Sequence, residues 1–295
     1  MKPALFAATI FTFNLGIYTQ VSAAPVKTPE KKTITNTKTP AKKPVTTTKT
    51  PNDFQQWCNP KTKLPQETRY TVEVLLKIAG TKNCTQANQK LIQLTTLNLW
   101  RSRISDIKPL SSLTNLTALN LWENQISDIK PLANLTNLTS LDLGGNQISD
   151  IQPLSKLTKL TTLNLWENRI SDIQPLSNLT NLTFISLWKN QISDIKPLSN
   201  LNNLTSLDLK ENQISDIESL SNLTQLTTVY LGGNQISNIQ SLSNMTKLNV
   251  VYLEKNQIQN IESLSALENL RTLKIENNPL ISKQCPLRPR SICKF

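Results

Sequence analysis

Four of the five tryptophans recur at one position of a 22-residue spacing. They are Trp100, Trp122, Trp166 and Trp188. A fixed period places such side chains in one column when the chain coils with that period. An indole ring offers a large apolar area and an N–H donor, and tryptophan is among the residues that dominate binding energy at interfaces. These residues therefore indicate recognition by stacking and burial rather than covalent chemistry.

Residues for catalysis are scarce. The 295 residues include no histidine and four cysteines, which fall into two pairs. No nucleophile has a base that can be named, so a hydrolase has no support. The sequence predicts that the chain is not an enzyme, and that it needs no cofactor and no metal.

The four cysteines lie outside the regularly spaced tract, Cys58 and Cys84 before it and Cys285 and Cys293 after it. In an exported chain an even number of cysteines normally forms disulfides, here one at each end. A metal site is the alternative, but there is no Cys-x-x-Cys spacing and no histidine.

The tract itself is a repeat. The motif L-x-x-L-x-L-x-x-N-x-I-S-D-I-x-P-L-x-x-L-x-x begins at Leu94 and returns every 22 residues without an insertion. Leu119 and Leu121 alternate as in a strand, Pro131 restarts the chain after a turn, and Leu132 suits a short 3₁₀ segment. The predicted fold is an α/β repeat solenoid with a parallel β-sheet on its concave face and 3₁₀ segments on its convex face.

The ends of a stacked array need lids, because a single repeat buries too little to fold alone. We expect the repeats over 94–281, as eight full units and a terminal partial one. A helical N-terminal cap is predicted over 53–93, with Pro65 at a helix start and Gly80 as a stop, and a C-terminal cap over 282–295.

Residues 1–23 have the features of a secretory signal peptide. Lys2 supplies the positive start, 4–17 the apolar stretch and 21–23 a small-residue cleavage site. An uncleaved anchor is the alternative, but the stretch is shorter than the roughly 20 residues of a spanning helix. We therefore expect a secreted, periplasmic or cell-surface protein with no transmembrane segment after cleavage.

Residues 24–52 are rich in Lys, Thr and Pro and contain no aromatic residue, which predicts a disordered linker. Of the formal net charge of +12, the signal and linker hold +7, leaving +5 on 53–295. The linker's lysines either attach to an anionic wall or membrane or simply keep a solvated spacer extended. Nucleic acid is not expected as a partner, because no basic stripe runs through the repeats.

Polar residues also recur inside the units. The ninth position is asparagine except for Ser102 in the first unit, and we expect this ladder to satisfy backbone groups where each strand leaves the sheet. The Ser-Asp pairs, such as Ser127 and Asp128, are interpreted as turn caps, with a calcium ladder as the alternative. The asparagines of the ladder are Asn124, Asn146, Asn168, Asn190, Asn212, Asn234, Asn256 and Asn278.

With these residues in view, the tract resembles the bacterial 22-residue leucine-rich repeats of the internalin type, through N-Q-I-S-D-I-x-P-L-x-N-L-T-N-L. The resemblance implies a horseshoe whose concave sheet grips a partner protein. The Cys-bearing ends look more like repeat proteins of environmental bacteria such as cyanobacteria. Similar repeats elsewhere regulate an intracellular phosphatase, a role that requires an uncleaved signal.

A ligand is expected on the concave face, at the third, fifth and seventh positions of each unit, because alternate strand residues point to opposite sides. Gly144 is predicted to leave a space of roughly 10 Å between Trp122 and Trp166 that admits a flat group. The alternative is that the tryptophans only stack on one another. The predicted binding residues are Trp100, Trp122, Trp166, Trp188, Phe184, Tyr230, Tyr252, Asn120, Asp142 and Asn164.

The class of ligand stays open at this point. A protein partner suits a mixed aromatic and polar face. Tryptophans edged by Asn, Asp and Glu also suit the stacking and hydrogen bonding of sugar rings, so a glycan or cell-wall ligand is the alternative. The oligomeric state is not indicated by the sequence.

Overall fold

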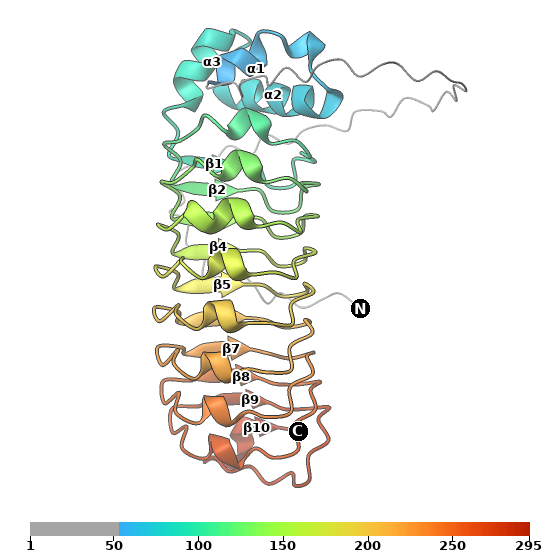
Figure 1. The fold of residues 1–295 in the computed structure, drawn as a ribbon, viewed down its shortest axis with the longest axis vertical. Coiled ribbons are helices and arrows are strands. Elements are labelled where there is room, and N and C mark those ends of the chain that lie inside the picture. The colour runs from blue at the N-terminus through green and yellow to red at the C-terminus, as the bar shows by residue number, and fades with distance from the viewer. Residues whose placement is uncertain (1–52) are drawn as a thin grey trace, which may run out of the picture. The chain divides into compact units, whose positions relative to one another are not determined.

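The computed structural model describes residues 53–295. The predicted signal peptide and linker lie outside the described residues. Figure 1 shows a stack of strands in chain order, with three helices grouped beyond the first strand. Within 53–295, no helix is long and apolar enough to cross a membrane.

The helices at the start form a cap. They are α1 (Phe54–Cys58), the 3₁₀ segment η1 (Lys61–Lys63), α2 (Gln66–Ala79) and α3 (Cys84–Leu91). Helix α2 begins directly after Pro65 and ends at Ala79. The next residue, Gly80, caps it with a φ of 64°, a left-handed conformation that glycine adopts without steric cost. Both ends of α2 are thus set by the residues from which they were predicted.

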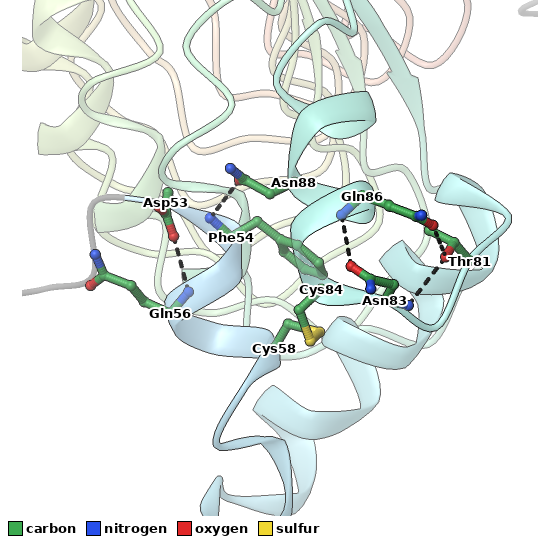
Figure 2. Close-up of a disulfide and its surroundings, with 9 residues drawn as sticks. All are labelled: Asp53, Phe54, Gln56, Cys58, Thr81, Asn83, Cys84, Gln86 and Asn88. Carbon is green, nitrogen blue, oxygen red and sulfur yellow. Dashed lines mark hydrogen bonds between the residues drawn. A yellow bond between two sulfur atoms is a disulfide. The ribbon is translucent and has the colours of Figure 1, made fainter.

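Helices α1 and α3 are tied to each other. Figure 2 shows the Cys58–Cys84 disulfide between the end of α1 and the start of α3, with the two Cα atoms 5.5 Å apart. The backbone N–H of Phe54 donates to Asn88 Oδ1 at 3.2 Å, and the Phe54 ring is fully buried. The short helix α1 is therefore held by a covalent bond as well as by its own core residue.

The cap seals the first repeat through α2. Leu75 is fully buried, and the hydroxyl of Thr71 donates to the backbone carbonyl of Asp106 at 2.6 Å. The hydroxyl of Thr68 donates to the Asp106 side chain. The cap is thus bonded to the turn of the first repeat, which has no repeat in front of it.

Within residues 53–295, ten strands form a single parallel sheet, and each strand pairs with its neighbour in the chain. Leu97 pairs with Leu119 and Leu119 with Leu141, so the register advances by one repeat per strand. The strands are β1 (Thr96–Asn98), β2 (Ala118–Asn120), β3 (Ser140–Asp142), β4 (Thr162–Asn164), β5 (Phe184–Ser186), β6 (Ser206–Asp208), β7 (Thr228–Tyr230), β8 (Val250–Tyr252), β9 (Thr272–Lys274) and β10 (Cys293–Lys294).

The opposite side of each coil is a 3₁₀ segment. The first five repeats start it with a proline near its N-terminus, where a missing N–H leaves no bond unmade. The segments are η2 (Lys108–Leu110), η3 (Lys130–Leu132), η4 (Gln152–Lys156), η5 (Gln174–Leu176), η6 (Lys196–Leu198), η7 (Glu218–Leu220), η8 (Gln240–Leu242), η9 (Glu262–Leu264) and, in the tail, η10 (Arg290–Ile292).

The core is one continuous column of leucine and isoleucine between these two sides. In the second repeat every predicted apolar position is at most 2% exposed: Leu116, Leu119, Leu121, Ile126, Ile129, Leu132 and Leu135. The buried cluster runs without a break from Phe54 in the cap to Ile292 in the tail. The core therefore needs none of the aromatic residues that follow the strands.

The asparagine ladder joins each repeat to the one before it. Asn124 Oδ1 accepts from Ile104 N at 2.9 Å, and its Nδ2 donates to Leu99 O at 2.9 Å and Leu121 O at 2.8 Å. Two of these three partners belong to the preceding repeat. The first repeat has no predecessor, which explains why Ser102 is sufficient there.

The Ser-Asp turns are also built by hydrogen bonds. Asp128 Oδ1 accepts from the backbone N–H of Lys130 at 2.9 Å. Asn238 makes the same bond to Gln240, also at 2.9 Å, although an amide carries no charge. The position therefore acts as a hydrogen-bond acceptor, which supports the turn-cap interpretation over a calcium ladder.

The tail closes the far end and contributes a strand that the repeat pattern does not predict. Strand β10 pairs in parallel with β9, and Ile275 N donates to Lys294 O at 3.0 Å. The Cys285–Cys293 disulfide anchors this strand, and Leu287 is buried against the last repeat. The second cysteine pair thus fixes a lid made of sheet, whereas the first fixes a lid made of helices.

Candidate binding face

The outward side chains of the strands form a continuous surface, called here the sheet face: the third, fifth and seventh positions of the repeats. Along β2, Leu119 is buried, while Ala118 and Asn120 on either side of it are partly exposed. The seventh position follows each strand but stays fixed to the next repeat, since Arg101 N donates to Trp122 O at 3.0 Å. Tryptophans at this position are therefore set on a regular backbone.

The tryptophan column consists of Trp100, Trp122, Trp166 and Trp188. The ring centroids of Trp100 and Trp122 are 5.2 Å apart with an interplanar angle of 8°, and those of Trp166 and Trp188 are 5.6 Å apart at 23°. Trp122 and Trp166 meet edge to face at 5.9 Å and 60°. All four rings form one contact series.

The prediction of an open space at Gly144, between Trp122 and Trp166, is wrong. A Cβ placed on Gly144 would lie 2.3 Å from Trp166 Nε1, so the Trp166 ring covers the glycine. Without a side chain at 144, the ring of the next repeat can lie against the backbone and reach Trp122. No flat group can enter between the two rings.

The rings of the column differ in their solvent exposure, and two of them have indole N–H groups without a hydrogen-bond partner. Trp100, at the start, is 40% exposed, and the other three are partly buried. The Nε1 atoms of Trp122 and Trp188 are buried without a hydrogen-bond partner. The Arg101 guanidinium lies 5.0 Å from the Trp100 ring and 5.5 Å from the Trp122 ring. A cation therefore already covers the outer edge of the first pair.

Polar side chains at the fifth position accept hydrogen bonds from the backbone N–H of the seventh position. Asn120 Oδ1 accepts from Trp122 N at 2.9 Å, and Asn164 makes the same type of bond to Trp166 at 3.4 Å. Asp142 Oδ1 accepts from the Gly144 backbone at 3.0 Å, and its Oδ2 accepts from Asn164 Nδ2 at 3.2 Å. Burial raises the pKa of Asp142 to about 6, and the two hydrogen bonds oppose this only in part.

The other predicted aromatic residues lie on the same face but apart from the column. Phe184, the first residue of β5, is at the third position of its repeat and is partly buried. Tyr230 and Tyr252 meet edge to face with their centroids 4.9 Å apart. Lys210 links the two groups, because its Nζ is 5.5 Å from the Trp188 ring and 5.0 Å from the Tyr230 ring.

Several charged residues on this face were not among the predicted binding residues. Lys210, Glu254 and Glu276 occupy the same seventh position as the tryptophans, and Arg101 lies beside the first of them. Their position in the repeat would have identified them. The prediction does not include them because, apart from the aromatic residues, it takes only Asn120, Asp142 and Asn164 of the fifth position.

The eighth position forms a charged rim with an unusual backbone. Glu123, Glu167 and Lys189 have φ between 50° and 56°, in the left-handed region, where Gly145 and Gly233 also lie. Lys189 Nζ is 2.6 Å from Glu167 Oε1, and Arg101 pairs with Glu123. The left-handed conformation costs a non-glycine residue about 1 kcal/mol or more, and an exposed ion pair contributes less than about 1 kcal/mol. Stability does not account for charged residues here.

Comparison with protein families gives a match to the model for leucine-rich repeats in two copies. It matches residues 92–134, 136–178, 158–200, 180–222, 202–244 and 224–264, more than half of the chain. Comparison with curated protein sequences gives no match.

Solved structures provide further relatives. An internalin of Listeria monocytogenes, inlF, is 40% identical with a TM-score of 0.67, over 70% of this chain and 62% of the internalin. A second from the same organism, internalin C2, is 35% identical with a TM-score of 0.65, over 68% of this chain and 90% of that one. A plant peptide hormone receptor, RGFR1, solved in complex with RGF2, is 25% identical with a TM-score of 0.52, over 58% of this chain and 30% of the receptor. The chain thus spans less than two thirds of inlF.

Proposed function

The chain belongs to the leucine-rich-repeat family, in its internalin-like branch. We propose that it is a non-catalytic recognition module that works outside the cell. In this proposal it binds a partner protein through the sheet face. The observation that carries this proposal is the tryptophan column. Four indole rings in series lie outside a core that is already complete without them. Aromatic surface of this kind characterises binding sites.

The charged rim supports the same proposal. Its side chains occupy left-handed positions that glycine fills in two of the repeats. Because neither packing nor ion pairing compensates for that conformation, we assign these charges to recognition. Aromatic centres bordered by charged residues are the usual composition of protein interfaces.

The relatives agree with binding rather than catalysis. RGFR1 is a receptor solved with RGF2 bound. The present chain contains no histidine and no free cysteine among its described residues. Its two disulfides suit an oxidising environment outside the cytosol.

A glycan ligand is less well supported by the ring geometry. Sugars stack on exposed faces of aromatic rings, but in this column the faces of Trp100 and Trp122, and of Trp166 and Trp188, are turned toward each other. The surface that remains free consists mainly of ring edges and the outer side of Trp100. Such a surface suits the side chains of a protein partner.

The test compares protein capture by the full-length chain and by tryptophan variants. We expect W122A/W166A, and W100A at the most exposed ring, to lose partners captured by cross-linking from surface and secreted proteins. I281A is the matched control, because Ile281 is 83% exposed and outside the strands. Circular dichroism checks that the variants fold.

Two results would contradict the proposal. One is a set of captured proteins that is the same for the tryptophan variants and the I281A control. The other is tryptophan-dependent retention on a glycan array or on pelleted peptidoglycan in place of protein capture, which would establish the carbohydrate alternative.

A further inference from the structure

The far end of the sheet face carries carboxylates that have no partner. Resting on the proposed function, we infer that the bound partner segment is an extended basic peptide. It presents an arginine or lysine to Glu254 and Glu276, four to six residues away from an apolar side chain that lies against the tryptophan column.

The first support is the state of the two carboxylates. Glu254 and Glu276 follow neighbouring strands β8 and β9, and the Oε2 atom of each is buried without a hydrogen-bond partner. Neither takes part in an ion pair within 53–295. The Glu254 carboxylate lies over Gly232, where an added Cβ would be 2.5 Å from its Cδ. The two side chains are otherwise partly exposed, so a ligand can reach them. A cation supplied by a ligand would give each carboxylate the charge-assisted hydrogen bonds that it lacks.

The second support is that the two nearby lysines of the fifth and seventh positions, Lys210 and Lys274, are already engaged. Lys210 Nζ is 3.8 Å from Asp208 Oδ2 and lies between the Trp188 and Tyr230 rings. Lys274 Nζ is 4.2 Å from the Tyr252 ring centroid. Asp208 adds a like charge: burial raises its pKa to about 6, and Glu254 raises it further while Lys210 opposes both. At the third, fifth and seventh positions of the last four repeats, three carboxylates, Asp208, Glu254 and Glu276, accompany two lysines, Lys210 and Lys274.

The third support is charge complementarity over the whole face. Its third, fifth and seventh positions carry four carboxylates, Asp142, Asp208, Glu254 and Glu276, and two lysines, Lys210 and Lys274. Residues 53–295 together have a net charge of +5. An acidic face on a basic body attracts a basic segment to that face and not to the remainder of the surface.

The strand spacing sets the length of the segment. Trp188 follows β5, whereas Glu254 follows β8 and Glu276 follows β9, which is three and four strand spacings away. At about 4.8 Å per strand this corresponds to about 14 to 19 Å. An extended peptide advances about 3.3 Å per residue, so about four to six residues separate the two anchors.

Arginine fits this end better than lysine. Its planar guanidinium has five N–H donors and can bond to both carboxylates at once. The class of ligand is thus a peptide with an apolar anchor and one arginine.

The experiment selects phage-displayed random peptides of about a dozen residues on the immobilised full-length chain. Enriched sequences are synthesised, and their dissociation constants are measured by fluorescence anisotropy for the wild type, E254Q/E276Q and W122A/W166A. The matched control is E218Q/E262Q, which makes the same change at exposed glutamates of η7 and η9 on the opposite side.

We expect enriched peptides to contain an arginine or lysine about four to six residues from an aromatic or aliphatic residue. E254Q/E276Q should weaken their binding about tenfold to a hundredfold, and the control should change it by less than about twofold. Exchanging the arginine of the peptide for glutamine should abolish the difference between the wild type and E254Q/E276Q.

The variants separate the two proposals. If W122A/W166A weakens binding but E254Q/E276Q does not, the basic anchor is refuted and the binding function of the face stands. If neither pair of substitutions affects any enriched peptide, both proposals are refuted. E254Q/E276Q should also unfold at no lower urea concentration than the wild type, which excludes a merely structural loss.

Discussion

Strands β1–β5 and β6–β9 have the same register and cover equally buried core residues, yet the side chains on their outer surface are satisfied in different ways. In the first half, rings cover rings and the charges of the rim are paired, as in Arg101 with Glu123. In the second half, Glu254 and Glu276 have buried oxygens without partners. On the sheet face, the unpaired buried atoms of the first half are the indole nitrogens of Trp122 and Trp188, which are neutral donors, whereas those of the second half are carboxylate oxygens, which are acceptors. One backbone thus carries two surfaces that call for different ligand groups.

The largest expected effect comes from the core, which we expect to be equivalent in the two halves although their outer surfaces differ. Leu121 and Leu253 occupy the same sixth position in the two halves, and both are fully buried. L121A and L253A should each lower the free energy of unfolding by about 2–5 kcal/mol, because each leaves a cavity. Urea unfolding followed by circular dichroism measures this. Costs that differ by more than about 3 kcal/mol, which is the spread of Leu→Ala costs at buried sites, would show that the two halves are packed differently.

A smaller effect should sharpen the comparison at two glycines of the seventh position. An alanine at Gly144 would meet the rigid Trp166 ring at 2.3 Å, whereas at Gly232 it would meet the flexible end of Glu254 at 2.5 Å. We expect G144A to cost about 1–3 kcal/mol and G232A less than about 1 kcal/mol. Urea unfolding gives the costs, and tryptophan fluorescence should change only in G144A. Equal costs would contradict the packing of Trp166 over Gly144.

The smallest expected effect concerns the carboxylate below the column. The pKa of Asp142 is raised by burial from 3.8 to about 6. Because the unfolded chain then loses its proton first as the pH rises, stability falls between about pH 4 and pH 6 and stays level above that range. Asparagine occupies the same position at Asn120 and Asn164. D142N should therefore increase stability at pH 8 by about 1–2 kcal/mol.

Urea unfolding at a series of pH values tests this expectation. The slope between about pH 4 and pH 6 should decrease in D142N but not vanish, because the pKa of Asp208 is also raised to about 6, chiefly by burial. A slope identical to that of the wild type would show that burial does not raise the pKa of Asp142 in the folded chain.

Much of the fold follows from the period of the sequence, and the reasons for the exceptions are physical. A strict 22-residue repeat places the position of Leu119 inward and the position of Trp122 outward in every unit, so the tryptophan column could be predicted. The rotamer of Trp166 could not, since it depends on the space above Gly144. Strand β10 lies outside the repeat, and its pairing with β9 leaves no periodic signal. The unpaired state of Glu254 depends on where Lys210 and Lys274 point, which spacing alone does not determine.

Because of the asparagine ladder and the unbroken register, equivalent side chains on the sheet face are always a whole number of strand spacings apart. Every unit bonds to its predecessor in the same way, so adding or removing one complete unit between Trp188 and Glu254 would leave all other side chains on their own side of the sheet. It would change the distance between Trp188 and Glu254 by one strand spacing of about 4.8 Å. The length of the recognised segment would then change in steps of one to two residues, with no redesign of either end.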